Sequence, residues 1–348
     1  MNASHPANPF YSSILPVGKL PHQLLQRLLG KAPIFDKRVL FGPGLGRDCA
    51  VVDAGKNLLV FKTDPITFAD DQIGWYAVQV SVNDIATMGA LPRWYMATLL
   101  LPEGKTNLAL VEQIFEQIFA ACREMEISLV GGHTEITHGI DRPILVGTMI
   151  GEVAHHELVT PQGIQPGDHI LLTKGVPIEG TAILARQVPG RLLPIIGEDG
   201  LLEAANFLFH PGISVLKDAQ IAVHAGHVSG MHDPTEGGLI TALWEMAQVC
   251  GMQLLVNLQL VPIPVISRKI CHALNLDALR TIASGSLLIA VSASDAASII
   301  RALEEHGINC TDIGRLEKGN AGVINIAGGR DEQVLPATRD EICKIFET

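Results

Sequence analysis

Residues 72–88 read QIGWYAVQVSVNDIATM, and this segment organises the rest of the chain. Its apolar side chains fall on nearly every side of a helical projection, which is typical of a helix buried at the centre of a domain. The residues Gly89-Ala90-Leu91-Pro92 follow at once and are a strong stop signal. The pattern therefore predicts a central helix from Gln72 to Met88, followed by a strand from Tyr95 to Leu101.

The predicted helix carries an acid, Asp84, on the same face as Ala77, Val80 and Met88. A carboxylate that points into a protein interior is strongly destabilising unless another group compensates its charge. We therefore expect Asp84 to have a functional partner.

Two further acids stand where a core-building sequence would not place them. Asp48 lies in the segment GRDCA, residues 46–50, and Asp64 ends a strand predicted over residues 56–64. Two carboxylates about 4 Å apart repel by about 4 kcal/mol at an effective dielectric constant of about 20. A divalent cation removes this repulsion, and a cluster of oxygen ligands favours Mg²⁺. In the alternative interpretation each acid caps a turn or a helix.

This magnesium hypothesis makes a strict structural demand. It requires residues 48, 64 and 84 to meet in the folded chain. It fails if an arginine or a lysine already neutralises each of them.

Glycine-rich segments are the candidate phosphate sites. Residues 42–46, GPGLG, match neither the dinucleotide-binding pattern nor the Walker pattern. Residues 131–134, GGHT, and the pair Gly237-Gly238 at the start of a predicted helix would let backbone N–H groups approach an anion. A simple tight turn is the alternative for both. The histidines at 133, 138, 224 and 227 lack the spacing of a zinc site.

Composition restricts the class of protein. The 348 residues are 47% hydrophobic and 18% charged, which excludes a disordered chain, and no apolar run reaches the length of a membrane span. The net charge of −11 has the wrong sign for a nucleic-acid-binding protein. Six cysteines show no paired spacing, and the N-terminal residues lack a secretion signal. We expect a cytoplasmic protein that binds neither nucleic acid nor membrane.

Strand and helix patterns intermix along the whole chain, which indicates an α/β (α+β) architecture. The length favours two domains. We predict a flexible tail over residues 1–13, an N-terminal domain over 14–153 and a C-terminal domain over 165–348. A last helix is expected over Thr338–Phe346.

Five motifs, taken in chain order, resemble the aminoimidazole ribonucleotide synthetase (PurM-like) superfamily. They are residues 46–50, Thr63-Asp64, residues 81–92 (SVNDIATMGALP), residues 131–134 and residues 232–239 (HDPTEGGL). Within that superfamily the segments DPTEGGL and ASGSLL, residues 233–239 and 283–288, are most similar to the HypE-like branch of hydrogenase expression/formation proteins.

The resemblance implies a two-domain fold and a homodimer in which paired N-terminal sheets form a barrel. It also implies ATP and Mg²⁺ as cofactors, with Asp48, Asp64 and Asp84 as metal ligands and with Asp84 and Asp64 as catalytic residues. The residues that it implies for cofactor binding are Asn83, Gly131, Gly132, His133, Thr134, Asp233, Gly237 and Gly238.

HypE-like enzymes dehydrate an S-carbamoylated C-terminal cysteine, and this chain departs from them in two places. Its last cysteine, Cys343, is not terminal, and a packing role suits it better than a carrier role. His133 stands where the branch usually has Asp.

We therefore predict an ATP- and Mg²⁺-dependent enzyme that activates a small-molecule or protein-bound carbamoyl-type acceptor. The first alternative is a small-molecule kinase resembling thiamine-monophosphate kinase. The second is a nucleotide-binding regulator without turnover.

Overall fold

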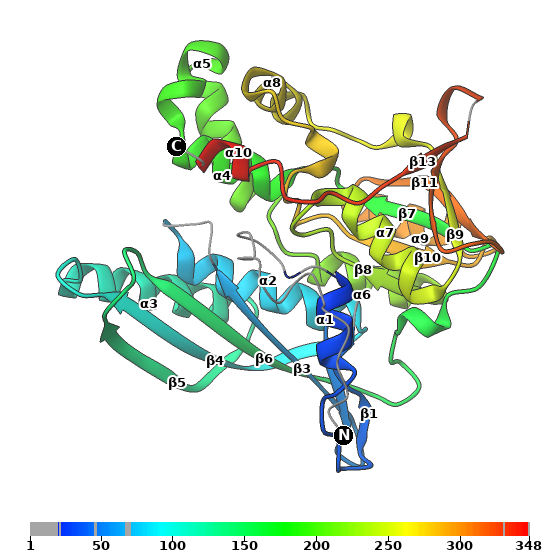
Figure 1. Cartoon of the computed structure of the whole chain (residues 1–348), viewed down its shortest axis with the longest axis horizontal. Helices are drawn as coiled ribbons and strands as arrows, with labels where there is room; N and C mark the ends of the chain where they lie inside the picture. Colours follow the sequence, from blue (N-terminus) through cyan, green and yellow to red (C-terminus); the bar gives the residue numbers. More distant parts are fainter. Residues whose placement is uncertain (1–19, 21, 45–46, 67–70, 330, 347–348) are drawn as a thin grey trace, which may run out of the picture.

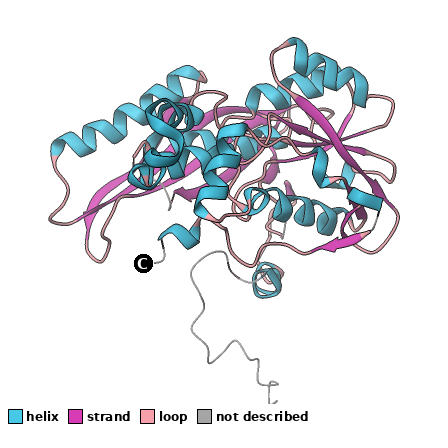
Figure 2. Cartoon of the chain, turned by 90° about the horizontal axis from the view of Figure 1, so that it is seen from above, coloured by secondary structure: helices cyan, strands magenta, loops and turns pink. Residues whose placement is uncertain are grey.

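The computed structural model describes residues 20, 22–44, 47–66, 71–329 and 331–346. The predicted tail over residues 1–13 lies outside this part of the chain. Two mixed α/β halves, each built on its own sheet, lie side by side (Figure 1). The view from above shows helices packed against both sheets (Figure 2). The predicted α/β (α+β) class is thus confirmed.

The first sheet has six strands in the order β1-β2-β3-β6-β4-β5. Neighbouring strands are antiparallel except β4 and β5, which run parallel. The strands are β1 (Val39–Phe41), β2 (Ala50–Asp53), β3 (Leu58–Ile66), β4 (Leu91–Pro102), β5 (Ser128–Thr137) and β6 (Ile144–Val153).

Helices α2 (Ile73–Thr87) and α3 (Leu108–Glu124) cover one face of this sheet (Figure 1). All but one residue of α2 are buried, as its all-round apolar pattern predicts. The reason is that α2 contacts both halves of the molecule: Ile85 packs in the core of the first sheet, whereas Tyr76 and Ala86 pack against residues of the second half. Asn107 is the N-cap of α3, since its side chain accepts the Leu110 N–H at 2.9 Å. Helix α1 (His22–Leu29) precedes the sheet.

The second sheet has seven strands in the order β13-β12-β9-β11-β7-β10-β8. Strand β10, which lies between β7 and β8, is buried on both faces, with Leu288 in the core under α7 and Ile289 in the core under α6 and α9. The strands are β7 (His169–Thr173), β8 (Val228–His232), β9 (Gln253–Val256), β10 (Leu288–Val291), β11 (Cys310–Glu317), β12 (Gly322–Asn325) and β13 (Glu332–Val334).

The helices of the second half form two groups. Helices α6, α7 and α9 pack on the sheet, and α4, α5, α8 and α10 form a cluster beyond it (Figure 1). They are α4 (Ile178–Gln187), α5 (Pro189–Ala205), α6 (Leu216–Ala225), α7 (Gly238–Cys250), α8 (Val265–Leu274), α9 (Ala296–Glu305) and α10 (Cys343–Phe346).

The last helix is shorter than predicted, because only Cys343–Phe346 is helical. The Asp340 side chain caps this turn by accepting the Ile342 N–H at 2.9 Å. None of the helices in the described part of the chain has the length and apolar character needed to cross a bilayer. The domain limits at 14, 153 and 165 stay a prediction.

Candidate functional site

The predicted acids come together where the two halves of the chain meet. Asp64 lies on β3, Asp84 on α2, Asp48 in the segment before β2, and Asp233 directly follows β8. Burial raises the pKa of Asp84 well above its usual value, and the charges of Asp233, Asp64 and Asp48 add to this rise. Burial and the nearby Asp48 likewise raise the pKa of Asp233 to about 6. The first demand of the magnesium hypothesis, convergence, is therefore met.

A lysine that the sequence reasoning did not assign lies among these acids. The Lys62 Nζ atom is 3.1 Å from Asp64 Oδ2 and 3.1 Å from Asp84 Oδ1. Burial alone would lower the pKa of Lys62, but Asp84, Asp64 and Asp48 outweigh it and raise this pKa well above its usual value. Lys62 is therefore a cation that pairs with two of the three predicted metal ligands.

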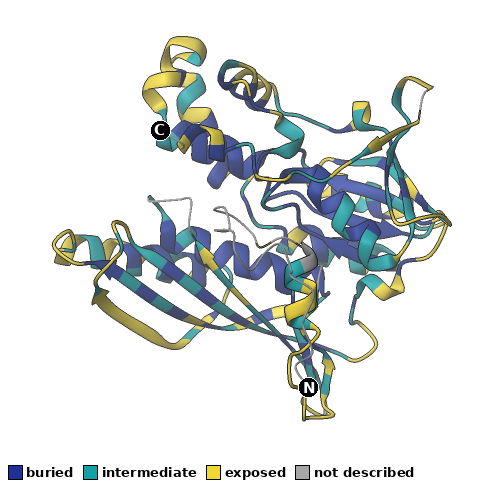
Figure 3. Ribbon diagram, viewed as in Figure 1, coloured by how far each residue is buried: buried dark blue, intermediate teal, exposed yellow. Residues whose placement is uncertain are grey.

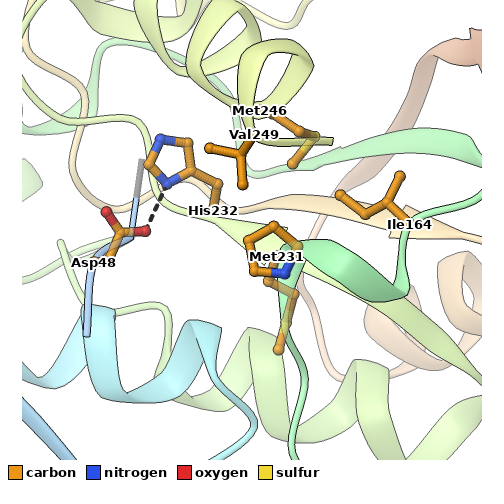
Figure 4. Close-up of a pocket in the computed structure, with 7 residues that line it drawn as sticks. Asp48, Ile164, Met231, His232, Met246 and Val249 are labelled. Carbon is orange, nitrogen blue, oxygen red and sulfur yellow. Dashed lines mark hydrogen bonds and ion pairs between the residues drawn. The ribbon is translucent and has the colours of Figure 1, made fainter. Parts of the chain in front are cut away.

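The third predicted ligand, Asp48, pairs with a histidine. Asp48 Oδ2 lies 3.0 Å from His232 Nδ1 (Figure 4). Glu245 Oε2 on α7 lies 3.1 Å from His232 Nε2. Burial opposes protonation of this ring, but the two carboxylates raise the pKa of His232 well above its usual value. The magnesium hypothesis would fail if an arginine or a lysine neutralised each of the three acids. Asp64 and Asp84 share one lysine, but Asp48 pairs with a histidine, so this condition for failure is only partly fulfilled.

A small pocket adjoins the imidazole of His232 (Figure 4). Its other walls are mostly apolar. The lining residues are Asp48, Pro161, Ile164, Met231, His232, Met246 and Val249.

Two carboxylate oxygens of the cluster are buried without a hydrogen-bond partner in the described part of the chain. They are Asp84 Oδ2 and Asp233 Oδ2, on residues that are 3% and 1% exposed. An unpaired buried carboxylate oxygen is costly unless a cation or another group compensates it. Single ligand atoms of Asp48, His232 and Asp233 lie within 4.8 Å of one another. The residues present therefore fit a Mg²⁺ ion on the Asp48 and Asp233 side of the cluster.

The GGHT segment lies away from this cluster within one chain. Gly131, Gly132, His133 and Thr134 are exposed on β5, the edge strand of the sheet (Figure 3). The sheet registers place Gly132 level with Asp64 but three strands away, roughly 14 Å. The tight-turn alternative is wrong here, because this segment pairs along β4 as a strand. At Gly132 only glycine fits, since φ is +147° and an added Cβ would collide with the Ala97 carbonyl.

Asn83 has a different partner from the predicted phosphate. Its Nδ2 donates to the Ile213 carbonyl at 2.8 Å, and its Oδ1 accepts the Val215 N–H at 2.9 Å. The side chain is fully buried, so both of its polar atoms serve the contact between the two halves. Its nucleotide role stays a prediction.

The Gly237-Gly238 pair does open a helix, since α7 begins at Gly238 with Gly237 as its N-cap. The Gly237 N–H, however, donates to Asp340 Oδ2 at 2.6 Å. A carboxylate of the chain itself therefore occupies the position predicted for an anion. The tight-turn alternative also has support here, because Gly237 and Gly238 have φ values of +82° and +65°.

Two α/β halves with a cluster of carboxylates at their junction define a two-domain α/β protein. Family models agree with this class. The AIR synthase related protein N-terminal domain matches residues 46–153, and the corresponding C-terminal domain matches residues 165–326.

Similarity to individual relatives identifies the branch of this family. The chain is 31% identical to a putative hydrogenase expression/formation protein from Methanocaldococcus jannaschii, over 80% of this chain and 81% of the relative. It is 29% identical to the carbamoyl dehydratase HypE of Cupriavidus necator, over 83% and 80%. A crystal structure of the hydrogenase maturation protein HypE in complex with ATP has the same fold, with a TM-score of 0.69, 24% identity and 92% coverage of both chains. The chain belongs to the AIR synthase related family, in its HypE-like branch.

Lys62, His232 and Glu245 are the site residues that sequence reasoning missed. A signal existed for Lys62, because side chains two apart in a strand share a face and Asp64 was already a candidate. His232 directly precedes Asp233, which was also a candidate. Nothing in the sequence indicated Glu245, since it reaches His232 only through the packing of α7 against β8.

Proposed function

We propose that this protein is an ATP- and Mg²⁺-dependent enzyme that transfers the γ-phosphoryl group of ATP to an acceptor. The observation that carries the proposal is the junction of Asp48, Asp64, Asp84 and Asp233, in which two buried carboxylate oxygens lack a partner. Membership of the AIR synthase related family supports it.

The chain's own residues suggest a division of labour. Asp48 and Asp233 would hold the metal, and Lys62 would keep Asp64 and Asp84 in place. Bound Mg²⁺ supplies positive charge that offsets the charge of the nucleotide phosphates. An acceptor oxygen then forms a bond to the γ-phosphorus while the bond to the bridging oxygen of ADP breaks. Positioning and electrostatic stabilisation account for most of the catalysis in such transfers.

A carbamoyl or amide oxygen is the acceptor that we favour, because the relative from Cupriavidus necator is named a carbamoyl dehydratase. In that chemistry the phosphorylated oxygen leaves as phosphate. The acceptor is not the chain's own last cysteine, since Cys343 is 4% exposed and burial raises the pKa of its thiol. The acceptor is therefore a separate small molecule or a group on another protein.

The burial of Cys343 also keeps a second candidate function open, a small-molecule kinase that leaves a stable phosphorylated product. Product analysis separates the two. After incubation with ATP, Mg²⁺ and carbamoyl or hydroxyl acceptors, the favoured function gives ADP and free phosphate only with the carbamoyl compound. A kinase gives a lasting phosphorylated product, and a regulator without turnover gives nucleotide binding and no ADP.

We further propose that the protein is a homodimer joined through the first sheet. In the single chain β5 is an exposed edge strand, and Val130 and Ile136 on it are 54% and 61% exposed (Figure 3). Unpaired edge strands are natural sites of association. The barrel expected from paired N-terminal sheets would place the GGHT segment at this interface.

A further inference from the structure

The ammonium group of Lys62 lies where a cation is needed between two carboxylates. Its Nζ atom is 3.1 Å from both Asp64 Oδ2 and Asp84 Oδ1, which come from strand β3 and helix α2 of the first half. The Lys62 side chain is 15% exposed and the Asp84 side chain 5%. This is a built contact, not a surface ion pair, because two buried or half-buried carboxylates converge on one nitrogen.

The free ligand atoms lie on the other side of the same carboxylates. Asp84 turns Oδ1 to Lys62, and its Oδ2 stays buried without a partner in the described residues, as does Asp233 Oδ2. The ligand atoms that lie within 4.8 Å of one another come from Asp48, His232 and Asp233, so one divalent ion on that side of the cluster leaves Lys62 in place.

A second divalent ion between Asp64 and Asp84 would have to displace the ammonium group. At equal distance, an ammonium and a divalent ion repel twice as strongly as two single charges do. Lys62 lies on β3, and two acids hold its head group. The geometry therefore favours one ammonium and one divalent ion over two divalent ions.

A lysine ammonium also has three hydrogen-bond donors. Asp64 and Asp84 each form an ion pair with this nitrogen at 3.1 Å. The third donor can then be directed to a phosphate oxygen, and lysine is a common point-charge ligand for phosphate.

We propose that Lys62 is a resident cation of this centre, which takes the place of one divalent ion between Asp64 and Asp84 and donates its third N–H to a nucleotide phosphate. Lys62 thereby acts as a positioning residue for both acids and limits the centre to a single divalent ion. The phosphate contact rests on the proposed function, whereas the ion count does not.

The test is a count of bound Mn²⁺, the paramagnetic substitute for Mg²⁺, by electron paramagnetic resonance on the full chain. Wild type should bind about one ion per chain. Lys62→Met removes the charge at similar length and should bind about two, whereas Lys62→Arg should again bind about one. Lys56→Met is the matched control, because Lys56 is exposed in the turn between β2 and β3, and it should behave as wild type. Two ions on wild type, or the same count on Lys62→Met, would overturn the proposal.

If Lys62→Met folds poorly, a measurement of thermal stability tests whether Lys62 acts as a cation of this centre. Without divalent ions this variant should unfold at a lower temperature than wild type, since two acids lose their counter-charge. Added Mn²⁺ should raise its unfolding temperature by clearly more than it raises that of wild type or Lys56→Met. Equal Mn²⁺ shifts in all three proteins would mean that Lys62 is only a packing residue, and the proposal would be wrong.

The same proteins separate this inference from the proposed function. A non-hydrolysable ATP analogue should bind wild type with Mn²⁺ and bind Lys62→Met at least tenfold more weakly. Failure of the analogue to bind wild type contradicts the proposed function, while the nucleotide-free ion count still decides the role of Lys62. Equal affinity of wild type and Lys62→Met for the analogue would contradict the proposed contact between Lys62 and a nucleotide phosphate.

Discussion

The side-chain oxygen of Asn83 accepts the Val215 N–H at 2.9 Å and so ties α2, at the centre of the first half, to the residue before α6 in the second half. The amide nitrogen of the same side chain donates to Ile213. Both bonds are buried, and the acid neighbour Asp84 follows Asn83 directly in the chain. The contact that joins the halves therefore also fixes the helix that carries the acid.

Replacing Asn83 by Ala should lower the free energy of unfolding by about 2 to 4 kcal/mol, because it leaves a buried N–H and a buried carbonyl without partners. Urea denaturation followed by circular dichroism measures this loss. The exposed Asn320→Ala serves as the control and should change stability by less than about 0.5 kcal/mol. Unchanged stability together with a large loss of nucleotide affinity would instead support the predicted phosphate role of Asn83.

Replacing Asp84 by Asn should abolish Mg²⁺-dependent ATP turnover, because it removes a carboxylate from the centre. The fold should survive, since the change also relieves the crowding that raises the pKa of Asp84 and its neighbours. Phosphate release and circular dichroism on the same sample measure both effects. Normal ATP turnover in this variant would show that Asp84 has no catalytic role.

Stability should depend on pH through Glu179, a buried acid of α4. Burial raises its pKa from 4.5 to about 7, against a hydrogen bond from Ser284 that lowers it. Between these two values the folded state holds a proton that the unfolded state has lost, so the free energy of unfolding falls as pH rises and levels off above about 7. The loss is on the order of 3 kcal/mol.

The Glu179→Gln variant should lack this part of the pH dependence and should be more stable than wild type at pH 8. Denaturant titrations from pH 4 to pH 8 give the comparison. Burial also raises the pKa values of Asp233 and Asp340 to about 6. These two acids contribute the same pH dependence to wild type and to Glu179→Gln, so their contribution cancels in the difference between the two proteins. The exposed Glu112→Gln should follow wild type, and parallel curves for wild type and Glu179→Gln would refute the assignment.

Dimerisation through the first sheet should be sensitive to charge on β5. Ile136→Lys places a cation on the exposed edge strand and should convert the dimer to a monomer in light-scattering measurements. Leu202→Lys is the control, because Leu202 is 70% exposed on α5 in the other half. A monomeric wild type, or a dimer that tolerates Ile136→Lys, would argue against this interface.

Local patterns were sufficient to predict the parts of the fold that local chemistry determines. The apolar run of α2 is an example, and its burial is confirmed. Strand β8 was missed, because Val228-Ser229-Gly230-Met231-His232 has little strand preference and becomes a strand through pairing with β10. Glycines 131 and 132 indicated a loop or a turn, yet β4 pairs with this segment along its whole length.

The site likewise combines features that local sequence patterns predict with contacts that only the tertiary structure reveals. Interior placement of Asp84 follows from helical periodicity, and its burial is confirmed. Lys62 shares a strand face with Asp64, which periodicity could have shown, but its pairing with Asp84 depends on how α2 lies on the sheet. The His232 contacts with Asp48 and Glu245 join residues 184 and 13 positions apart, so only the tertiary structure reveals them.

The most direct test of the central claim is the Mg²⁺ dependence of nucleotide binding, measured by titration calorimetry with a non-hydrolysable ATP analogue. With Mg²⁺ present, wild type should bind the analogue, and removal of the metal by a chelator should weaken binding by at least tenfold, about 1.4 kcal/mol. Asp233→Asn should show the same loss even with Mg²⁺. Equal affinity with and without the metal, or in Asp233→Asn and wild type, would contradict the account.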